Sequence, residues 1–208
     1  MKFEKLVLEG RVVELNNSIY PDCDYKGDDY FLTMPVDELN FKIDGIVGDR
    51  HRGFTTISGG RLTSLYDRGI EVRNNRMWSA ISPQEVYYID KRLETNNKLT
   101  PGLLGINLVI DGLGYLSSLK PMTYLVFSPD QENFKPGRKN DVVLVVYAQA
   151  LPCRIAGKAI AQALDAPNAE KNFAKVGLGY RGTTGWVEKP GIIKRDYKVF
   201  ALTPTGQD

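Results

Sequence analysis

Cys153 is the residue whose type and setting are most suited to chemistry. It stands in Leu151-Pro152-Cys153-Arg154, where an apolar run over 142–150 gives way to a predicted helix. Pro152 breaks strand pairing, Arg154 brings a cation next to the sulfur in sequence, and a helix N-terminus stabilises negative charge. All three features favour a thiolate, which is both a nucleophile and a soft metal ligand. The alternative is a small buried hydrophobic residue where a strand meets a helix.

A second cluster surrounds His51, the one histidine of the chain, which lies between Arg50 and Arg52 in a glycine-bounded loop. Arginine side chains pair with phosphate or carboxylate through two N–H donors, and glycines let a ligand approach the backbone closely. The cluster is therefore an anion-binding hypothesis. The alternative is that Asp49 pairs with Arg50 while the other charges are solvated.

Two polar residues, Ser82 and Asn107, also stand out. Ser82 opens the pattern Ser-Pro-Gln-Glu, which predicts a helix N-cap, and the N-terminus of that helix could face a phosphate group. Asn107 stands at the start of an apolar strand, where a buried amide costs free energy unless it is hydrogen-bonded. We therefore expect a backbone or ligand partner for Asn107.

Familiar catalytic motifs are absent from the sequence. A single histidine excludes a two-histidine zinc site, and no CxxC, Gly-x-Ser-x-Gly or Walker A pattern occurs. A nucleophile pair of Cys153 and His51 would have to be assembled by the fold, because neither residue is near the other in sequence.

Composition excludes several classes of partner. The net charge is +2 and the basic residues are scattered along the chain, so we expect no nucleic-acid binding. No apolar run approaches the ~20 residues of a membrane span, and the N-terminal segment lacks a secretory signal pattern. We expect a cytoplasmic protein without membrane contact, in which Cys23 and Cys153 both stay reduced.

The elements that must position these residues form a mostly β pattern with peripheral helices, in one domain over residues 1–208. One helix is predicted from Ser82 to about Leu93, and others follow Cys153 over 155–164 and 168–176. Predicted strands cover 5–15 with a bend or bulge at Gly10, 77–81, 124–127, 142–147, 180–187 and 198–202, with a hairpin turn at Asp44-Gly45. Residues 101–110 are predicted to form a turn that enters a further strand, which stops at Asp111-Gly112. A Pro190-Gly191 turn is predicted to join the last two strands, and 16–34 reads as a long surface loop.

The order of these motifs resembles the MOSC family, named for the C-terminal domain of molybdenum cofactor sulfurases. The matching residues are Gly45-Ile46-Val47-Gly48-Asp49-Arg50-His51, Trp78-Ser79-Ala80-Ile81-Ser82, Pro101 to Leu108, Pro152-Cys153-Arg154, Arg181-Gly182 and Pro190-Gly191. They span most of the chain. Many stand-alone members of the family carry glutamate where this chain has Ile106.

The resemblance implies a MOSC-type β-barrel that binds the molybdenum cofactor, molybdopterin. Cys153 would be the catalytic residue and the metal or sulfur ligand, and Asn107 would contact the cofactor. Arg50, His51, Ser82 and Arg181 would serve the phosphate end of the pterin.

Two functions follow from the resemblance and stay open at this point, beside the alternative, indicated by Ile106, of a degenerate barrel that binds neither cofactor nor sulfur. One is reduction of N-hydroxylated small-molecule substrates with electrons from a partner reductase. The other is a sulfur-carrier or cofactor-delivery module that receives sulfur from a donor and holds it as a persulfide on Cys153. Pyridoxal phosphate binding is also associated with the family, but the desulfurase domain that uses it has no counterpart in this chain, so we expect no release of sulfur from free cysteine.

Overall fold

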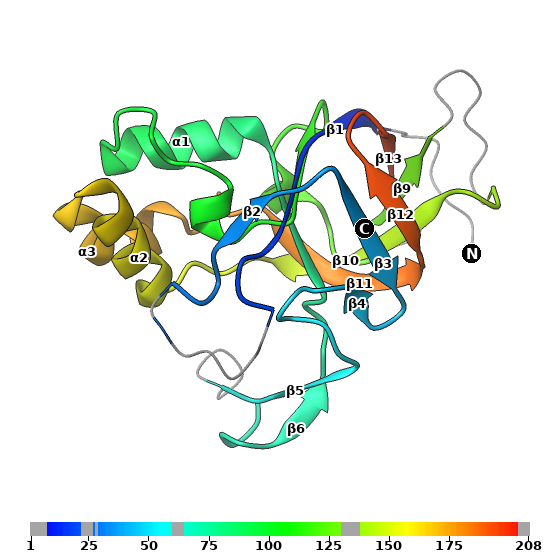
Figure 1. The fold of residues 1–208 in the computed structure, drawn as a ribbon, viewed down its shortest axis with the longest axis horizontal. Helices are drawn as coiled ribbons and strands as arrows, with labels where there is room; N and C mark the ends of the chain where they lie inside the picture. Colours follow the sequence, from blue (N-terminus) through cyan, green and yellow to red (C-terminus); the bar gives the residue numbers. More distant parts are fainter. Residues whose placement is uncertain (1–7, 22–26, 28, 60–64, 130–137, 204–208) are drawn as a thin grey trace.

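A closed β-barrel of seven strands forms the centre of the molecule in the computed structural model, which describes residues 8–21, 27, 29–59, 65–129 and 138–203 (Figure 1). The strands are β1 (Leu8–Ser18), β7 (Trp78–Ile81), β8 (Leu108–Asp111), β9 (Tyr124–Ser128), β10 (Val142–Gln149), β11 (Thr183–Lys189) and β13 (Lys198–Leu202). Their order is β13-β9-β10-β11-β7-β8-β1, and pairing of β1 with β13 closes the ring. Among these seven described strands, only the neighbours β7 and β8 run parallel. The predicted mostly β barrel with peripheral helices is confirmed.

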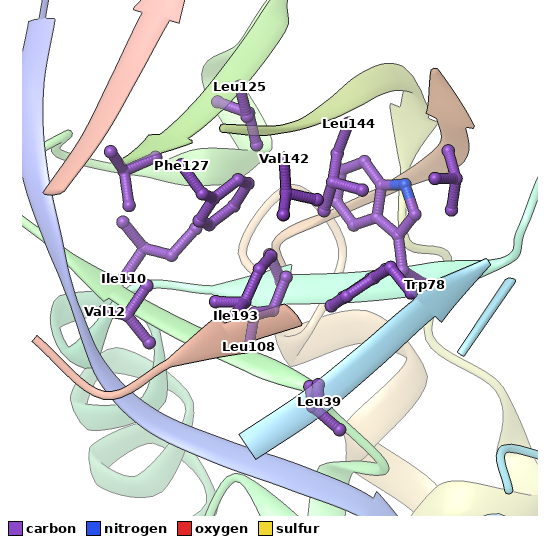
Figure 2. Packing of buried hydrophobic residues seen from close by; sticks show 14 of the residues in the cluster. Val12, Leu39, Trp78, Leu108, Ile110, Leu125, Phe127, Val142, Leu144 and Ile193 are labelled. Carbon is purple, nitrogen blue, oxygen red and sulfur yellow. The ribbon is translucent and has the colours of Figure 1, made fainter. Parts of the chain in front are cut away.

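The barrel interior is filled by side chains that alternate along the strands. Val142, Leu144 and Val146 of β10 stand two residues apart and are all fully buried, as a strand with one face inside requires. Figure 2 shows such side chains from several strands pointing toward one another, with Trp78 and Phe127 as the large rings. This packed core holds the strand ends in fixed positions.

A second, three-stranded sheet covers one side of this core. It has the order β12-β3-β4, made of β12 (Gly191–Lys194), β3 (Glu38–Lys42) and β4 (Gly45–Ile46), and it contributes buried Leu39 and Ile193 to the interior (Figure 2). The predicted hairpin is confirmed, but its turn is Ile43-Asp44, since Gly45 already pairs with Lys42. The predicted turn at Pro190-Gly191 is wrong, because Gly191 begins β12 and pairs with β3.

Two short pairings were missed because their strands are only three residues long. β2 (Thr33–Pro35) pairs with the end of β1, so the predicted loop over 16–34 is partly strand, and its residues 22–26 and 28 lie outside the described part. β5 (Thr55–Ile57) and β6 (Glu71–Arg73) form a ribbon that projects from the barrel (Figure 1).

The predicted bulge in β1 is displaced. The pairing of β1 with β8 shifts between Val12 and Glu14 and not at Gly10, which pairs in register with Val199. Gly10 is needed for another reason, since a Cβ there would meet the Asp111 carbonyl and the side chain of Leu113.

Three helices pack together beside the barrel: α1 (Pro83–Leu93), α2 (Arg154–Leu164) and α3 (Pro167–Val176) (Figure 1). Their inner faces form a second core with Ile81, Leu104 and Ile106. Helices α2 and α3 approach closely because Gly157 has no side chain, and a Cβ there would lie 2.8 Å from the Ala169 carbonyl oxygen. None of the helices in the described residues is long and apolar enough to cross a membrane.

Between α1 and β8 the chain makes the 3₁₀ turn η1 (Gly102–Leu104), which ends at Gly105 in the left-handed conformation with φ 64°. The predicted turn that enters a strand is confirmed, and the strand begins at Leu108. A Cβ on Gly105 would lie 2.5 Å from the Phe31 carbonyl oxygen, so the end of the 16–34 segment lies directly on this turn. A second 3₁₀ turn, η2 (Leu116–Ser118), follows β8.

Candidate functional site

Asn107 is held between the two parallel strands of the barrel. It directly precedes β8, and it faces Ser79 of β7. The Asn107 Oδ1 accepts hydrogen bonds from the Ser79 backbone N–H at 3.0 Å and from the Ser79 hydroxyl at 3.1 Å. The Asn107 backbone N–H donates in turn to the Ser79 carbonyl at 3.2 Å. Both hydrogen bonds to the side-chain oxygen of this buried residue therefore come from Ser79.

The nitrogen side of the same amide binds Asp49. Asn107 Nδ2 donates to Asp49 Oδ2 at 2.8 Å, and the Ser18 hydroxyl donates to the same oxygen at 3.0 Å. The other oxygen, Oδ1, accepts from the His51 backbone N–H at 2.7 Å and lies 3.2 Å from His51 Nδ1. Asp49 is therefore the centre of a polar network that ties the Gly48–Gly53 loop to the start of β8.

The pKa of Asp49 is consistent with this hydrogen-bond network. Burial of the carboxylate raises its pKa, but the hydrogen bonds and positive charge of His51 and the amide of Asn107 outweigh burial, so the pKa of Asp49 is lowered from its ordinary value. A carboxylate that accepts several hydrogen bonds stays ionised in the folded protein. Hydrogen bonds from Ser18, His51 and Asn107 stabilise this charge inside the network.

The three cationic side chains of this loop have separate partners. Arg50 donates from Nη1 to the Tyr30 carbonyl at 2.8 Å and stacks its guanidinium 3.9 Å from the centre of the Tyr30 ring. Arg52 pairs with Asp44 at 2.9 Å, and His51 pairs with Asp49. The donors that were expected to converge on an anion are thus directed at three different groups, and Asp49 pairs with His51 where the alternative expected Arg50.

Ser82 is the N-cap of α1 and is fully buried. Its hydroxyl accepts from the Glu85 backbone N–H at 3.3 Å, and its own backbone N–H donates to Glu85 Oε2 at 2.9 Å. The other oxygen of Glu85 accepts from the Ser117 backbone N–H at 2.8 Å. The predicted capping box is confirmed, and the Ser82 side chain is occupied by it.

Cys153 is the N-cap of the 11-residue helix α2, with extended backbone angles of φ −136° and ψ 159°. Its side chain is half-buried and packs against the core that the helices share with Leu104 and Ile106. Arg154 was expected to place its cation beside this sulfur, but its guanidinium pairs with Glu170 of α3 at 2.9 Å. The N-terminus of α2 is a local source of positive potential for Cys153.

Arg181 is buried close to the segment that leads to Cys153. Its Nη2 donates to the Leu104 carbonyl at 2.6 Å, and the neighbouring Gly182 carbonyl accepts from the Ala150 backbone N–H at 3.0 Å. Gly182 has φ 71°, and a Cβ on it would collide with the Ala80 carbonyl. These contacts place Arg181 between the chain approaching Cys153 and the 3₁₀ turn that precedes Asn107.

The predicted site residues therefore form three groups. Asn107 joins His51 through Asp49, Arg181 joins the approach to Cys153 through backbone contacts, and Ser82 is separate in its helix cap. Sequence reasoning missed Ser79 as a partner of Asn107, and it missed the central role of Asp49. The signal that could have found them is the need of a buried Asn107 amide for both donors and acceptors.

The described residues do not provide a complete set of protein ligands for a metal ion. No group of three or more His, Cys, Asp or Glu side chains among them is arranged to hold a metal ion. A metal at Cys153 would therefore take its other ligands from outside this part of the protein, as a ligand-bearing cofactor would provide them.

Comparisons with known proteins agree with the architecture and the motif order. The family model of the MOSC domain matches residues 67–199. YuaD of Bacillus subtilis (strain 168), a protein named in connection with metal-sulfur cluster biosynthesis, is 30% identical over 164 residues, which are 78% of this chain and 79% of YuaD.

Solved structures agree as well. The crystal structure of YuaD from Bacillus subtilis covers 97% of this chain and 99% of its own, with a TM-score of 0.81 and 26% identity. YiiM from Geobacillus stearothermophilus shares the fold with a TM-score of 0.57 at 15% identity, over 95% of this chain and 77% of that one. Together the matched model and the matched relative show that this chain belongs to the MOSC domain family.

Proposed function

We propose that the protein is a sulfur carrier in which Cys153 holds sulfane sulfur as a persulfide and passes it to a client. The observation that carries this proposal is the position of Cys153 at the N-terminus of α2, half-buried on an apolar core. Backbone N–H groups at a helix N-terminus stabilise a thiolate, and partial burial shields a persulfide from water. A relative named for metal-sulfur cluster biosynthesis supports the same chemistry.

The transfer needs no group other than the two thiols and the donor. The Cys153 thiolate attacks the outer sulfur of a donor persulfide, the S–S bond of the donor breaks, and the donor leaves as a thiolate. A client thiolate then attacks the outer sulfur on Cys153, and the Cys153 thiolate leaves. The sulfur keeps its oxidation state throughout, and the helix N-terminus stabilises Cys153 in both steps as attacking and leaving group.

The second candidate is a molybdenum-cofactor protein that reduces N-hydroxylated compounds with a partner reductase. Membership of the MOSC family and the soft thiolate of Cys153 favour it, because a thiolate is a ligand that molybdenum accepts. The metal end of the cofactor therefore fits this chain. Its phosphate end does not, because Ser82 and Arg181 are buried and hydrogen-bonded within the protein, while Arg50 and His51 are hydrogen-bonded to Tyr30 and Asp49.

One preparation distinguishes the two candidates. The protein is incubated with a cysteine desulfurase and cysteine, and sulfur released by cyanide is measured for wild type, Cys153→Ala and Cys23→Ser. Cys23→Ser is the matched control, because the chain holds two cysteines. The carrier proposal predicts close to one sulfur per chain in wild type and Cys23→Ser, and none in Cys153→Ala.

The metal content of the same proteins, expressed in a host that makes molybdopterin, completes the test. Stoichiometric molybdenum and pterin in wild type, lost in Cys153→Ala, would support the cofactor candidate and overturn the carrier. Equal sulfur loading of wild type and Cys153→Ala would also overturn the carrier, because the sulfur would then reside elsewhere.

A further inference from the structure

A groove on the outer side of α1 is lined by aromatic rings and cations, and none of the predicted cofactor residues lines it. It has a volume of about 580 Å³ and lies between α1 and Tyr115, which directly precedes η2. Small-molecule sites commonly have volumes of roughly 300–1,000 Å³. Helix α1 lies at the outer edge of the molecule, so a ligand can reach the groove from solvent (Figure 1).

The aromatic part of the lining is partly fixed by stacking. Tyr88 stacks on Tyr180 with ring centres 3.7 Å apart and an interplanar angle of 21°, and Tyr115 meets Tyr180 edge-on at 5.7 Å. Tyr87 and Tyr115 remain 60% and 45% exposed. The exposed surface of these two rings can contact a planar ligand, while Tyr88 is fixed by its stacking on Tyr180.

The cations of the groove are held over these rings. The guanidinium of Arg92 lies 4.8 Å from the centre of the Tyr88 ring, and the ammonium of Lys91 lies 5.3 Å from that of Tyr87. Within the described part of the chain, neither cation forms an ion pair with a carboxylate. Both side chains are exposed and can still pair with an anion.

The acidic and the basic side chains of α1 lie on different sides of the helix, the acidic ones buried and the basic ones exposed. Its acidic residues, Glu85 and Asp90, are buried and accept hydrogen bonds from the protein, whereas Lys91 and Arg92 are exposed. No carboxylate lines the groove. The surface is therefore positive at one end and aromatic along its length.

From this arrangement we propose that the α1 groove binds a planar aromatic ring that carries an anionic group, as in a nucleoside diphosphate. The ring would stack on Tyr115 or Tyr87, and the phosphates would reach Arg92 and Lys91, with Arg92 as the bidentate donor. The cations that lie over these rings are already in place for the charge of the ligand. This function is separate from sulfur handling at Cys153.

The test is a titration of the ¹⁵N-labelled protein with ADP, adenosine and inorganic phosphate, followed by amide chemical shifts. Saturable shifts are expected in residues 83–92 and at Tyr115, and ADP should bind at least about tenfold more tightly than adenosine or phosphate. Arg92→Gln should weaken ADP binding by about tenfold or more, whereas Lys171→Gln, an exposed lysine of α3 outside the groove, should leave it unchanged.

Other outcomes overturn the proposal. One is that inorganic phosphate binds as tightly as ADP. Another is that ADP changes the chemical shifts of amides outside the groove. The third is that the Arg92→Gln protein binds ADP as wild type does. If Arg92→Gln unfolds at the same temperature as wild type, a loss of ADP binding is due to the changed side chain and not to unfolding of the protein. Cys153→Ala should bind ADP normally, so failure of this proposal and failure of the sulfur carrier give different results.

Discussion

Asp49 and Asn107 are 58 residues apart in sequence, yet the Asn107 amide donates to the Asp49 carboxylate at 2.8 Å within the protein. The contact joins a surface loop to the start of a barrel strand. Asp49 is 5% exposed and Asn107 is 3% exposed. If one side chain of the pair is removed, water cannot readily take its place as the hydrogen-bond partner of the other. Both residues therefore act as positioning residues for the loop that carries Arg50 and His51.

The first prediction concerns this pair. Asn107→Ala and Asp49→Asn should each lower the free energy of unfolding by about 1–3 kcal/mol, because each leaves a buried polar group without its partner. In a double-mutant cycle the two effects should be coupled by about 0.5–3 kcal/mol. Urea unfolding of the four proteins measures this coupling. Asn107→Ala combined with Lys171→Gln is the control and should be additive, and additivity of the Asp49 pair would contradict the network.

Local patterns in the sequence predicted most of the barrel and all three helices. The alternation of Val142, Leu144 and Val146 and the capping box at Ser82 and Glu85 are local signals, and the structure confirms both elements. Where elements meet in space, local signals were insufficient. The strand that begins at Gly191 was missed because its pairing with β3 depends on residues 150 positions earlier, Phe41 among them.

The candidate site shows the same division. Cys153 was predicted at a helix N-terminus from the Pro152 break and the change of periodicity, and it stands there. The direction of Arg154 could not be predicted, because its partner Glu170 belongs to another helix. In the same way, the partners of Arg50, the Tyr30 carbonyl and ring, depend on how the 16–34 segment folds back over the loop.

The second prediction concerns Gly182, which stands beside Arg181. Gly182→Ala should be strongly destabilising, by more than about 3 kcal/mol, because the new Cβ collides with the Ala80 carbonyl and the residue has a left-handed backbone with φ 71°. Gly179→Ala is the matched control: its φ is 80°, but a Cβ there has no atom within 4 Å. It should cost only about 1–2 kcal/mol for the left-handed conformation. Thermal unfolding compares them, and equal losses would show that the close approach to Ala80 is unimportant.

The third prediction is a pH dependence at Asp90. Its carboxylate accepts from Thr95 Oγ1 at 2.6 Å and from the backbone N–H groups of Asn97 and Leu99 at 2.9 and 3.0 Å. Burial raises the pKa of Asp90, but these hydrogen bonds outweigh it, so the pKa is lowered from 3.8. The ionised form is therefore favoured by folding, and its contribution to stability is present above pH 3.8 and lost as pH falls through the lower folded pKa.

Asp90→Asn tests this sign. The variant should be about 1–3 kcal/mol less stable than wild type near neutral pH, because the amide loses charge-assisted hydrogen bonds. The difference should shrink steadily below about pH 4, where the wild-type carboxylate takes up a proton. Urea unfolding at several pH values measures both proteins. A difference that is constant over that range would assign the loss to packing and not to the charge of Asp90.

The fourth prediction separates a capping role of Ser82 from a ligand role. Ser82→Ala should lower the free energy of unfolding by about 0.5–2 kcal/mol, because the Glu85 backbone N–H loses its side-chain acceptor at the start of α1. Ser82→Gly should retain more of the stability than Ser82→Ala, since glycine is also a favoured N-cap residue and adds no charge beside the buried Glu85 carboxylate. Sulfur loading of Cys153 in folded Ser82→Ala should equal that of wild type. A Ser82→Ala protein that is as stable as wild type but takes up no sulfur would contradict the capping role. The Ser82 hydroxyl would then contact the ligand, because sulfur loading would be lost while the helix stays intact.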